Sequence, residues 1–366
     1  MKYIYLLVVS LLFISCSDFR IDSKNTITLD NIKYSETMLE VTSLHKGKMQ
    51  KVDVSDKYVS DFLVFDSLLI TQTNAKDGFW NFYSINSYKS YGKLLRIGKA
   101  KGEFAFPVSL TLHLTMGERS DSIISNIYDF STGRLYEINV SDFITNKKAN
   151  ITESKLSTKL RRNAFWMKSI NDSTMLYRYL EDDQTRQTRV LWSNNKKKDN
   201  KNINILNQCE IPNGEDFNII SSLISLSPDK EYVVEAMLGL NCIHVYSLSN
   251  EKGFSICVGD DVDQIKDIVS TPFPERKYVF ADLRAYNFGF GVLKYDITEK
   301  VYQTNGEYYP SILFFDWNGN SLGEIKSDIK FNHFDYDEKK DELYILDSEG
   351  GLLKTKIKIP IANAPK

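Results

Sequence analysis

Near its C-terminus the chain reads FNHFDYDEKKDELYILDSEGGLLKTKIKI, from residue 331 to residue 359. Apolar or alternating runs at 331–336, 342–346 and 351–359 are separated by short polar segments rich in Asp, Glu, Lys and Gly. Alternation with a period of two, broken by turn-forming residues, is typical of β-strands joined by hairpins. The stretch therefore predicts three consecutive antiparallel strands.

The same pattern recurs along the chain. Strand-rich units start near residues 58, 107, 163, 217, 268 and 331, at intervals of roughly 45–60 residues, a period that indicates a repeat architecture. We therefore predict an all-β fold, a six-bladed β-propeller of four-stranded blades. The last unit holds only three strands of its own, so segment 26–54 is expected to add the fourth and close the ring, which leaves no long unpaired edge.

The N-terminus has the layout of a secretory signal: a short basic segment, an apolar run from Ile4 to Ile14, and the small residue Ser15 before Cys16. The run is shorter than the about 20 residues that a transmembrane helix needs. We predict a cleaved signal peptide at 1–15, a lipidated tether at 16–25 and the propeller domain at 26–366. An ordinary signal peptide with a nearby cysteine, or a short buried strand, are the alternatives.

Residues 13–16, Phe-Ile-Ser-Cys, resemble the lipobox of bacterial lipoproteins, although Phe13 replaces the usual Leu. The resemblance implies that Cys16 carries the lipid and that the chain is anchored in the bacterial cell envelope, at the outer membrane, on either the periplasmic or the surface face. Asp18 resembles the acidic surface-export signal of some Bacteroidetes-type lipoproteins.

The net charge of −2 gives no electrostatic case for binding nucleic acid. Contact with the membrane is expected through the lipid. The basic run at 194–202 contains no interleaved aromatic residues, and we predict that it forms a solvated hairpin loop.

Beyond Cys16 the chain has Cys209, Cys242 and Cys257, an odd number that rules out a fully paired framework. Cys242 and Cys257 flank a predicted hairpin. If residues 251–252 are its central turn residues, Cys257 lies opposite Tyr246, and a disulfide to Cys242 would be strained. We therefore expect three free thiols, at least some of them buried.

Residues 96–104 read RIGKAKGEF. This segment resembles the Gly-rich turn, ending in Gly-Glu-Phe, of six-bladed propeller lipoproteins of the TolB-like and NHL-like type from Bacteroidetes-type bacteria. The Pro usual before that ending is absent, and Pro107 follows it. The resemblance implies a fold and an envelope location, and little chemistry.

The residues of this segment predict a structural turn between blades. Gly98 and Gly102 permit a positive φ, Glu103 can accept hydrogen bonds from turn amides, and Phe104 can anchor the loop in the core.

No catalytic motif is present: there is no Gly-x-Ser-x-Gly, no His-Glu-x-x-His and no phosphate-binding loop. Four histidines and no Cys-x-x-C pair make a zinc site unfavourable. Residues 259–263, Gly-Asp-Asp-Val-Asp, could offer carboxylates to calcium, but they lack the rest of a calcium loop and are interpreted as a solvated turn. We predict no metal site and no cofactor, with calcium as the open alternative.

In a propeller, small ligands meet the inner strands and their connecting loops around the central channel. The candidate ligand-binding residues, each of which has a structural role as its alternative, are His113, Arg161, Arg162, Trp166, Arg284, Tyr286, His333 and Asp335. The sequence favours a non-catalytic binding or scaffold module for a protein, peptide or glycan. A metal-assisted propeller enzyme, a lyase or lactonase-like hydrolase, is the alternative and rests on analogy of fold. A subunit of an envelope complex is a third hypothesis.

Overall fold

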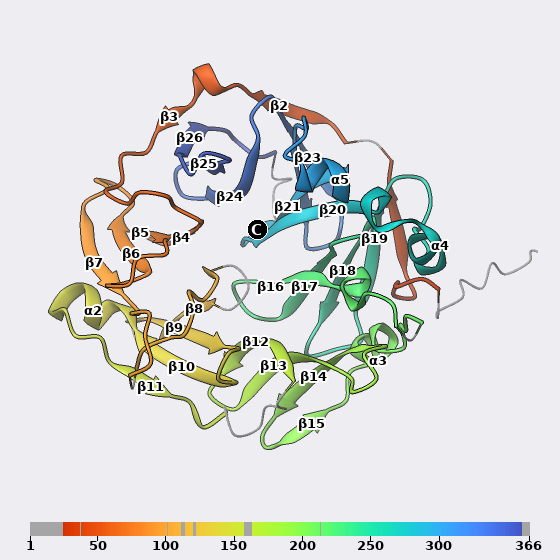
Figure 1. The fold of residues 1–366 in the computed structure, drawn as a ribbon, viewed down its shortest axis with the longest axis horizontal. Helices are drawn as coiled ribbons and strands as arrows, with labels where there is room; N and C mark the ends of the chain where they lie inside the picture. The colour runs from red at the N-terminus through yellow and green to blue at the C-terminus, as the bar shows by residue number, and fades with distance from the viewer. Residues whose placement is uncertain are drawn as a thin grey trace, which may run out of the picture.

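The computed structural model describes residues 25–36, 38–100, 102–110, 114–119, 122–156, 163–212 and 214–360. Its strands form six separate sheets that surround a common centre (Figure 1). Five of the sheets contain four antiparallel strands that follow one another in the chain from the centre outward, and two of these five carry an additional outer strand. The sheet of the last blade contains three such strands and a fourth from elsewhere in the chain. The prediction of an all-β, six-bladed propeller with four-stranded blades is confirmed.

Each blade starts with its innermost strand, and all but the last follow the chain for four strands. Blade one consists of β4 (Asp61–Phe65), β5 (Leu68–Gln72), β6 (Trp80–Ser84) and β7 (Ser90–Leu94). Blade two consists of β8 (Leu114–Arg119), β9 (Ser122–Asp129), β10 (Arg134–Asn139) and β11 (Ile151–Glu153). Blade three consists of β12 (Ala164–Asn171), β13 (Thr174–Leu180), β14 (Gln187–Ser193) and β15 (Lys196–Lys198). Blade four consists of β16 (Ser222–Leu226), β17 (Tyr232–Met237), β18 (Cys242–Ser247) and β19 (Gly253–Val258). Blade five consists of β20 (Lys277–Ala285), β21 (Gly289–Thr298), β22 (Ser311–Asp316) and β23 (Ser321–Ser327). Blade six has β24 (Phe331–Asp337), β25 (Glu342–Asp347) and β26 (Leu352–Lys356).

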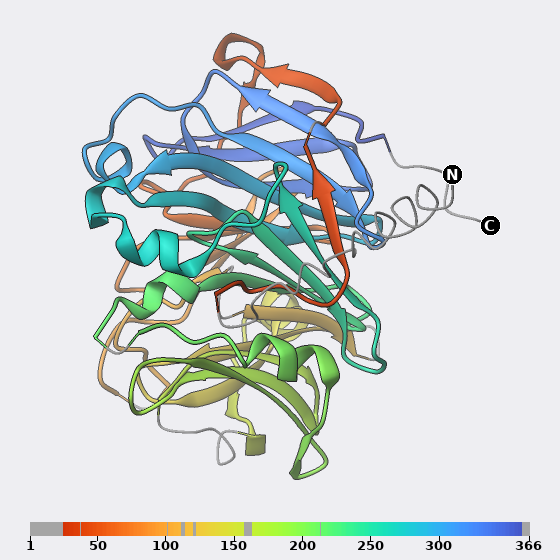
Figure 2. The same ribbon diagram turned by 90° about the vertical axis from the view of Figure 1, so that its right-hand side faces the viewer.

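The N-terminal segment runs along the outer edges of the last three blades. β1 (Ile32–Ser35) pairs parallel with β19, β2 (Glu40–Leu44) pairs parallel with β23, and β3 (Gln50–Lys51) pairs antiparallel with β26. Figures 1 and 2 show this segment, in red and orange, outside the teal and blue sheets. The sequence predicted one added strand, whereas the structure has three, two of which are fifth strands of blades four and five.

The basic run at 194–202 is not the predicted loop. Lys196–Lys198 forms β15, the exposed outer strand of blade three, and Lys201–Leu206 forms the helix α3. An outermost strand has a solvated edge, so it can consist of lysines. Asn200 starts the helix because its side chain accepts a hydrogen bond from the Ile203 amide.

The other helices are short and lie in connections: α2 (Val140–Asn146), α4 (Ile265–Ser270), α5 (Glu299–Gln303) and the 3-10 turns η1 (Lys46–Lys48), η3 (Phe217–Ile220) and η4 (Phe273–Glu275). Within the part of the chain that the structure describes, none has the length and apolar character needed to cross a membrane.

The predicted register of the cysteine hairpin is wrong. Cys242 lies directly opposite Cys257, and Tyr246 lies opposite Gly253. The reason is a longer turn of four residues, 248–251. The Ser247 amide donates to the Lys252 carbonyl, and the Ser247 hydroxyl accepts the amides of Ser249 and Asn250 inside the turn. All three cysteines are unbonded and buried, as expected of free thiols.

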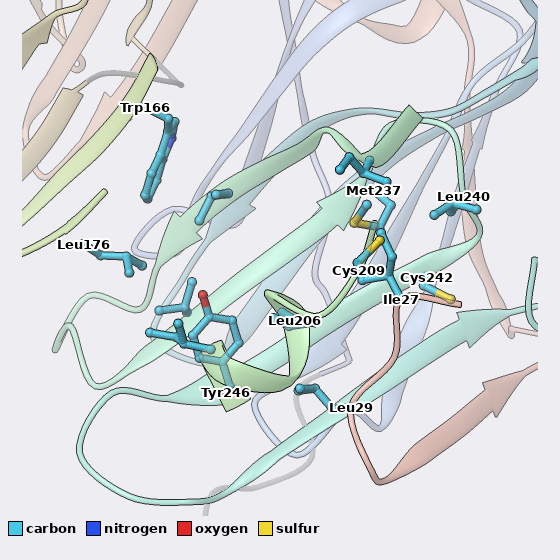
Figure 3. Packing of buried hydrophobic residues seen from close by; sticks show 14 of the residues in the cluster. Ile27, Leu29, Trp166, Leu176, Leu206, Cys209, Met237, Leu240, Cys242 and Tyr246 are labelled. Atoms are coloured by element: carbon cyan, nitrogen blue, oxygen red, sulfur yellow. The ribbon is translucent and has the colours of Figure 1, made fainter. Parts of the chain in front are cut away.

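Hydrophobic clusters fill the spaces between neighbouring blades. The largest joins blades three and four and includes Trp166, Leu176, Met237 and Tyr246 (Figure 3). Comparable clusters join the other pairs, for example Phe314 with Phe334 between blades five and six. The core is therefore divided among the blade interfaces, and the centre of the ring is left for other side chains.

Candidate functional site

A cavity of about 730 Å³ lies at the centre of the ring. All six inner strands, β4, β8, β12, β16, β20 and β24, contribute to its wall, which shows that it occupies the central channel. Its mouth is formed by the turns that follow the inner strands of blades one, four, five and six. The residues of these turns that line it are Asp66, Ser227, Pro228, Asp229, Lys230, Tyr286, Asn287, Glu338 and Lys339.

The walls carry aliphatic side chains, and the deeper part carries charges. Leu63, Leu110, Met116, Leu226 and Leu283 provide the apolar surface. Four buried charged residues also line the cavity: Lys168, Arg284, Asp335 and Asp337. Apolar walls with a few placed polar groups are typical of ligand sites, and the volume is within the usual range of roughly 300–1,000 Å³.

Arg284 connects three blades at this site. Its Nε donates to the Phe334 carbonyl at 2.8 Å and its Nη2 to the Phe62 carbonyl at 3.1 Å. The same Nη2 lies 3.2 Å from Asp282 Oδ2 and 3.7 Å from Asp61 Oδ1. Burial alone would lower the pKa of Arg284, but Asp282, Asp335 and Asp61 outweigh it and raise the pKa. Arg284 is therefore a permanent charge that fixes the shape of the cavity floor.

Asp335 accepts three hydrogen bonds, from the Val64 amide at 2.7 Å, the Tyr336 amide at 2.9 Å and the Tyr286 hydroxyl at 3.2 Å. Burial raises its pKa to about 6, and Arg284 opposes that shift. The structure thus brings together Arg284, Tyr286 and Asp335, three of the residues predicted to bind ligand.

His333 lies beside this group but does not line the cavity. Its Nδ1 is 3.3 Å from Asp282 Oδ2 and 3.7 Å from Asp61 Oδ1. Burial alone would lower the pKa of His333, but the two carboxylates outweigh it and raise the pKa. His333 is thus one of the groups that balance the carboxylates around Arg284.

Lys168 is a cavity residue that the sequence analysis missed. It is buried on the inner strand of blade three. Burial and the positive charge of Arg284 lower its pKa to about 7, while Asp61 opposes the shift. A lysine inside the apolar run AFWMKSIN was the available signal, because charged residues are rarely buried without a specific reason.

Trp166 is placed elsewhere. It packs in the hydrophobic cluster between blades three and four (Figure 3) and does not line the cavity. His113, Arg161, Arg162 and Cys16 lie outside the described residues.

The segment around Gly-Glu-Phe forms a tight turn between blades one and two. The Phe104 amide donates to the Arg96 carbonyl, the Gly98 amide donates to the Phe104 carbonyl, and Glu103 accepts from the Ala100 amide. Phe104 is buried. Gly102 has a φ of +84°, as predicted, whereas Gly98 does not have a positive φ. A Cβ at Gly98 would push the Glu103 carboxylate away from the Ala100 amide.

In the described ranges, no group of three or more His, Cys, Asp or Glu side chains is arranged to hold a metal ion. In the Asp-rich segment at 259–263, Asp263 accepts from the Asn241 amide, and the Asp261 carbonyl accepts from the Asn241 side chain. These two acceptors hold the loop against the end of β18.

The cavity thus combines a rigid charged floor with two groups that titrate near neutral pH. Lys168 and Asp335 can each donate or accept a proton or a hydrogen bond there, and buried groups of this kind in a cleft are typical of functional sites. This arrangement defines a propeller with a polar-floored central pocket.

No family model and no curated protein matches the chain. Among solved structures it is similar to a member of the DUF4221 family from Bacteroides vulgatus, with 13% identity, a TM-score of 0.51, and coverage of 93% of this chain and 100% of that one. It is also similar to a predicted exported protein from Bacteroides fragilis, with 10% identity, a TM-score of 0.51, and coverage of 89% and 99%. At these identities the likeness shows the fold alone.

Proposed function

We propose that this chain is a non-catalytic binding module of the bacterial cell envelope, which holds a peptide segment of a partner in its central cavity. The observation that carries the proposal is the cavity itself, which is open at the turns of four blades and bordered by all six inner strands. A propeller wall of this kind is rigid, so a ligand meets a preformed surface.

A peptide fits the chemistry of the lining better than a glycan does. The lining offers aliphatic side chains together with side chains of both charge signs. Its aromatic residues are Phe65, Tyr286 and Tyr336. The two tyrosines are buried and Tyr286 is stacked on Phe288, so Phe65 is the one partly exposed ring among the described residues of the lining, which is little aromatic surface for a sugar. A peptide supplies both apolar side chains and charges, which match these two parts of the lining.

The test is a selection of random heptapeptides displayed on phage against the full chain, compared with a variant whose cavity is blocked. Ser225→Trp places a large side chain into the cavity, because Ser225 lines it on β16. Ser321→Trp adds the same side chain on the exposed start of β23 and is the matched control. Peptides enriched on the wild type and on Ser321→Trp, but not on Ser225→Trp, support the proposal. Enrichment that survives the blocked cavity, or no enrichment at all, contradicts it.

The envelope location is part of the same proposal and rests on the signal-like N-terminus and the lipobox resemblance at Cys16. We expect Cys16→Ala to move the chain from the membrane fraction to the soluble fraction, while Ser17→Ala leaves it in the membrane fraction. A diacylated and N-acylated cysteine holds a protein firmly, so the change should be nearly complete. A Cys16→Ala chain that stays in the membranes after detergent-free fractionation would count against the anchor.

We also propose that β3 closes the ring. Its antiparallel pairing of Lys51 with Leu353 and of Gln50 with Lys354 supports this, because it gives the last blade its fourth strand. The resemblance to TolB-like and NHL-like lipoproteins belongs to this proposal as well.

A further inference from the structure

Cys242 and Cys257 occupy a special position in blade four. They face each other across β18 and β19. The next pair of residues, Asn241 and Val258, carries the backbone hydrogen bond, from the Val258 amide to the Asn241 carbonyl at 2.9 Å. Hydrogen-bonded and non-hydrogen-bonded pairs alternate in an antiparallel ladder. The two cysteines therefore form a non-hydrogen-bonded pair, in which side chains approach each other most closely.

The two sulfur atoms are 3.0 Å apart. Non-bonded carbon atoms sit about 3.5–4.0 Å apart, and sulfur is larger than carbon. The Cα atoms of non-hydrogen-bonded pairs are separated by about 4.5 Å, which falls inside the range of roughly 4.4–6.8 Å found in disulfides. The backbone thus already holds the geometry that a bond between these sulfurs requires.

We propose that Cys242 and Cys257 form an intramolecular disulfide when the chain folds in an oxidising compartment. The reaction is a thiol–disulfide exchange with the disulfide of an envelope oxidoreductase. A thiolate from one cysteine attacks that disulfide and forms a mixed disulfide, and the second thiolate then displaces the oxidoreductase. One sulfur–sulfur bond forms in this chain, the oxidoreductase disulfide is reduced to two thiols, and the two protons pass to them. In the cell the step depends on the export that is part of the proposed function, but not on any ligand.

The bond must form before the hairpin is fully packed. In the folded chain Cys242 is 1% exposed and Cys257 is 0% exposed, so no second protein can reach them. The hydrogen bond to Cys257 and burial also raise the pKa of Cys242, which disfavours the reactive thiolate. The folded thiols are therefore inert, and oxidation belongs to the folding of the hairpin.

The disulfide would stabilise the place where the N-terminal segment attaches. β19 carries Cys257 and pairs with β1 on its other side, with Tyr34 opposite Cys257. The Ser255 hydroxyl, two residues from Cys257, accepts the Leu29 amide at 2.8 Å. A covalent link between β18 and β19 thus ties the strand that holds the N-terminal segment to the interior of blade four.

Peptide mapping tests the proposal directly. The full chain is purified from its native cells, unfolded without reductant, alkylated and digested with trypsin. Cleavage after Lys230, Lys252 and Lys266 separates the two cysteines, with Cys242 in peptide 231–252 and Cys257 in peptide 253–266. We expect these two peptides to be joined by a disulfide and the peptide with Cys209 to be alkylated. A link to Cys209 contradicts the proposed pairing, and alkylation of all three cysteines contradicts formation of the bond in the cell.

A refolding experiment tests the pairing of the two cysteines independently of where the chain folds in the cell. The reduced full chain is refolded in a mixture of oxidised and reduced glutathione and mapped in the same way. If the linked peptides form here but not in cells, the pairing is supported and the proposed export is wrong. If both peptides remain alkylated after refolding, the pairing itself is overturned.

Thermal unfolding supplies a second readout. Reductant should lower the Tm of the wild type and of Cys209→Ala, whose cysteine lies in the same hydrophobic cluster. It should leave the Tm of Cys257→Ala unchanged. A wild-type Tm that does not respond to reductant in protein that contains the linked peptides would contradict the stabilising role.

Discussion

The propeller buries opposite charges both between blades three and four and at the cavity floor, and these two places differ in kind. Between the blades, Arg189 makes a double contact with Glu235, with Nε 2.9 Å from Oε1 and Nη2 2.7 Å from Oε2. Tyr246 and Ser222 donate to the same carboxylate at 2.6 and 2.9 Å. Burial would raise the pKa of Glu235, but Arg189 outweighs it and lowers the pKa to about 2.

The interblade cluster, formed by Arg189, Glu235, Tyr246 and Ser222, therefore keeps one charge state. It borders the buried hydrophobic interface between blades three and four. At the cavity floor, in contrast, Lys168 and Asp335 have pKa values of about 7 and about 6, and both line an open space. Burial of charge is common to both places, so burial does not mark a site by itself. Access, together with a charge state that can change near neutral pH, distinguishes the cavity from the structural network.

The largest effect is expected from a substitution that breaks the interblade cluster. Arg189→Met leaves the carboxylate of Glu235 buried without its main partner, and removal of one member of a buried ion pair costs about 3–5 kcal/mol. Urea unfolding should show this loss in the free energy of unfolding, with an unchanged m-value.

Arg186→Met is the matched control, because Arg186 pairs with Glu210 at 3.1 Å on the surface. Exposed pairs contribute about 0–1 kcal/mol. Equal effects of the two substitutions would remove the distinction between this network and an ordinary surface pair.

The second effect concerns the cavity and depends on pH. In the folded chain Lys168 loses its proton near pH 7, whereas its ordinary pKa is 10.5. The unfolded state therefore binds more protons between these values, and stability rises with pH across this window, by on the order of 3 kcal/mol. Lys168→Met should abolish this rise in urea unfolding measured from pH 6.5 to pH 9.5.

Lys266→Met removes an exposed lysine from α4 and should keep the wild-type dependence. If Lys168→Met rises with pH as steeply as the wild type, Lys168 is charged in the folded state throughout, and the cavity floor resembles the interblade cluster.

The repeat of strands was predictable from the sequence, because the alternation of apolar and polar residues marks each strand within its own segment. The run at 342–346, for example, was expected as a strand, and Glu342–Asp347 is one. The outer strands β1, β2 and β15 were not placed correctly, since they are polar, exposed on an edge and held by backbone pairing that the side-chain pattern does not encode. The predicted register of the cysteine hairpin failed because its turn has four residues, 248–251, and not two. The Ser247 hydroxyl accepts the amides of Ser249 and Asn250 in this turn, and the alternation of apolar and polar residues does not encode such bonds.

The candidate site was predictable only in part. Arg284, Tyr286 and Asp335 stood out as polar residues on inner strands or their loops, and they do come together. Lys168 was missed because it acquires its role from Arg284 and Asp61, which belong to other blades. Asp282 was missed although its main charge partner, Arg284, lies two residues away on the same strand, because its second partner is His333 on the next blade. Trp166 was misplaced because an aromatic residue on an inner strand can face the neighbouring blade instead of the channel.

The smallest expected effect is the titration of Asp335. Its pKa in the folded chain, about 6, lies above its ordinary value of 3.8, so the folded state holds this proton more tightly than the unfolded state. The stability that results is complete below the unfolded pKa and is lost as the pH rises through about 6. The wild type should therefore lose on the order of 2 kcal/mol relative to Asp335→Asn between pH 4 and pH 7.5.

Urea unfolding of both proteins across this range measures the difference. Asp77→Asn, an exposed carboxyl that pairs with Lys93, should run parallel to the wild type at every pH. A constant offset between Asp335→Asn and the wild type would mean that Asp335 keeps one charge state over the whole range. In that case its three hydrogen bonds fix the carboxylate as firmly as Arg189 fixes Glu235, and the cavity would retain Lys168 as its single group that titrates near neutral pH among the described residues.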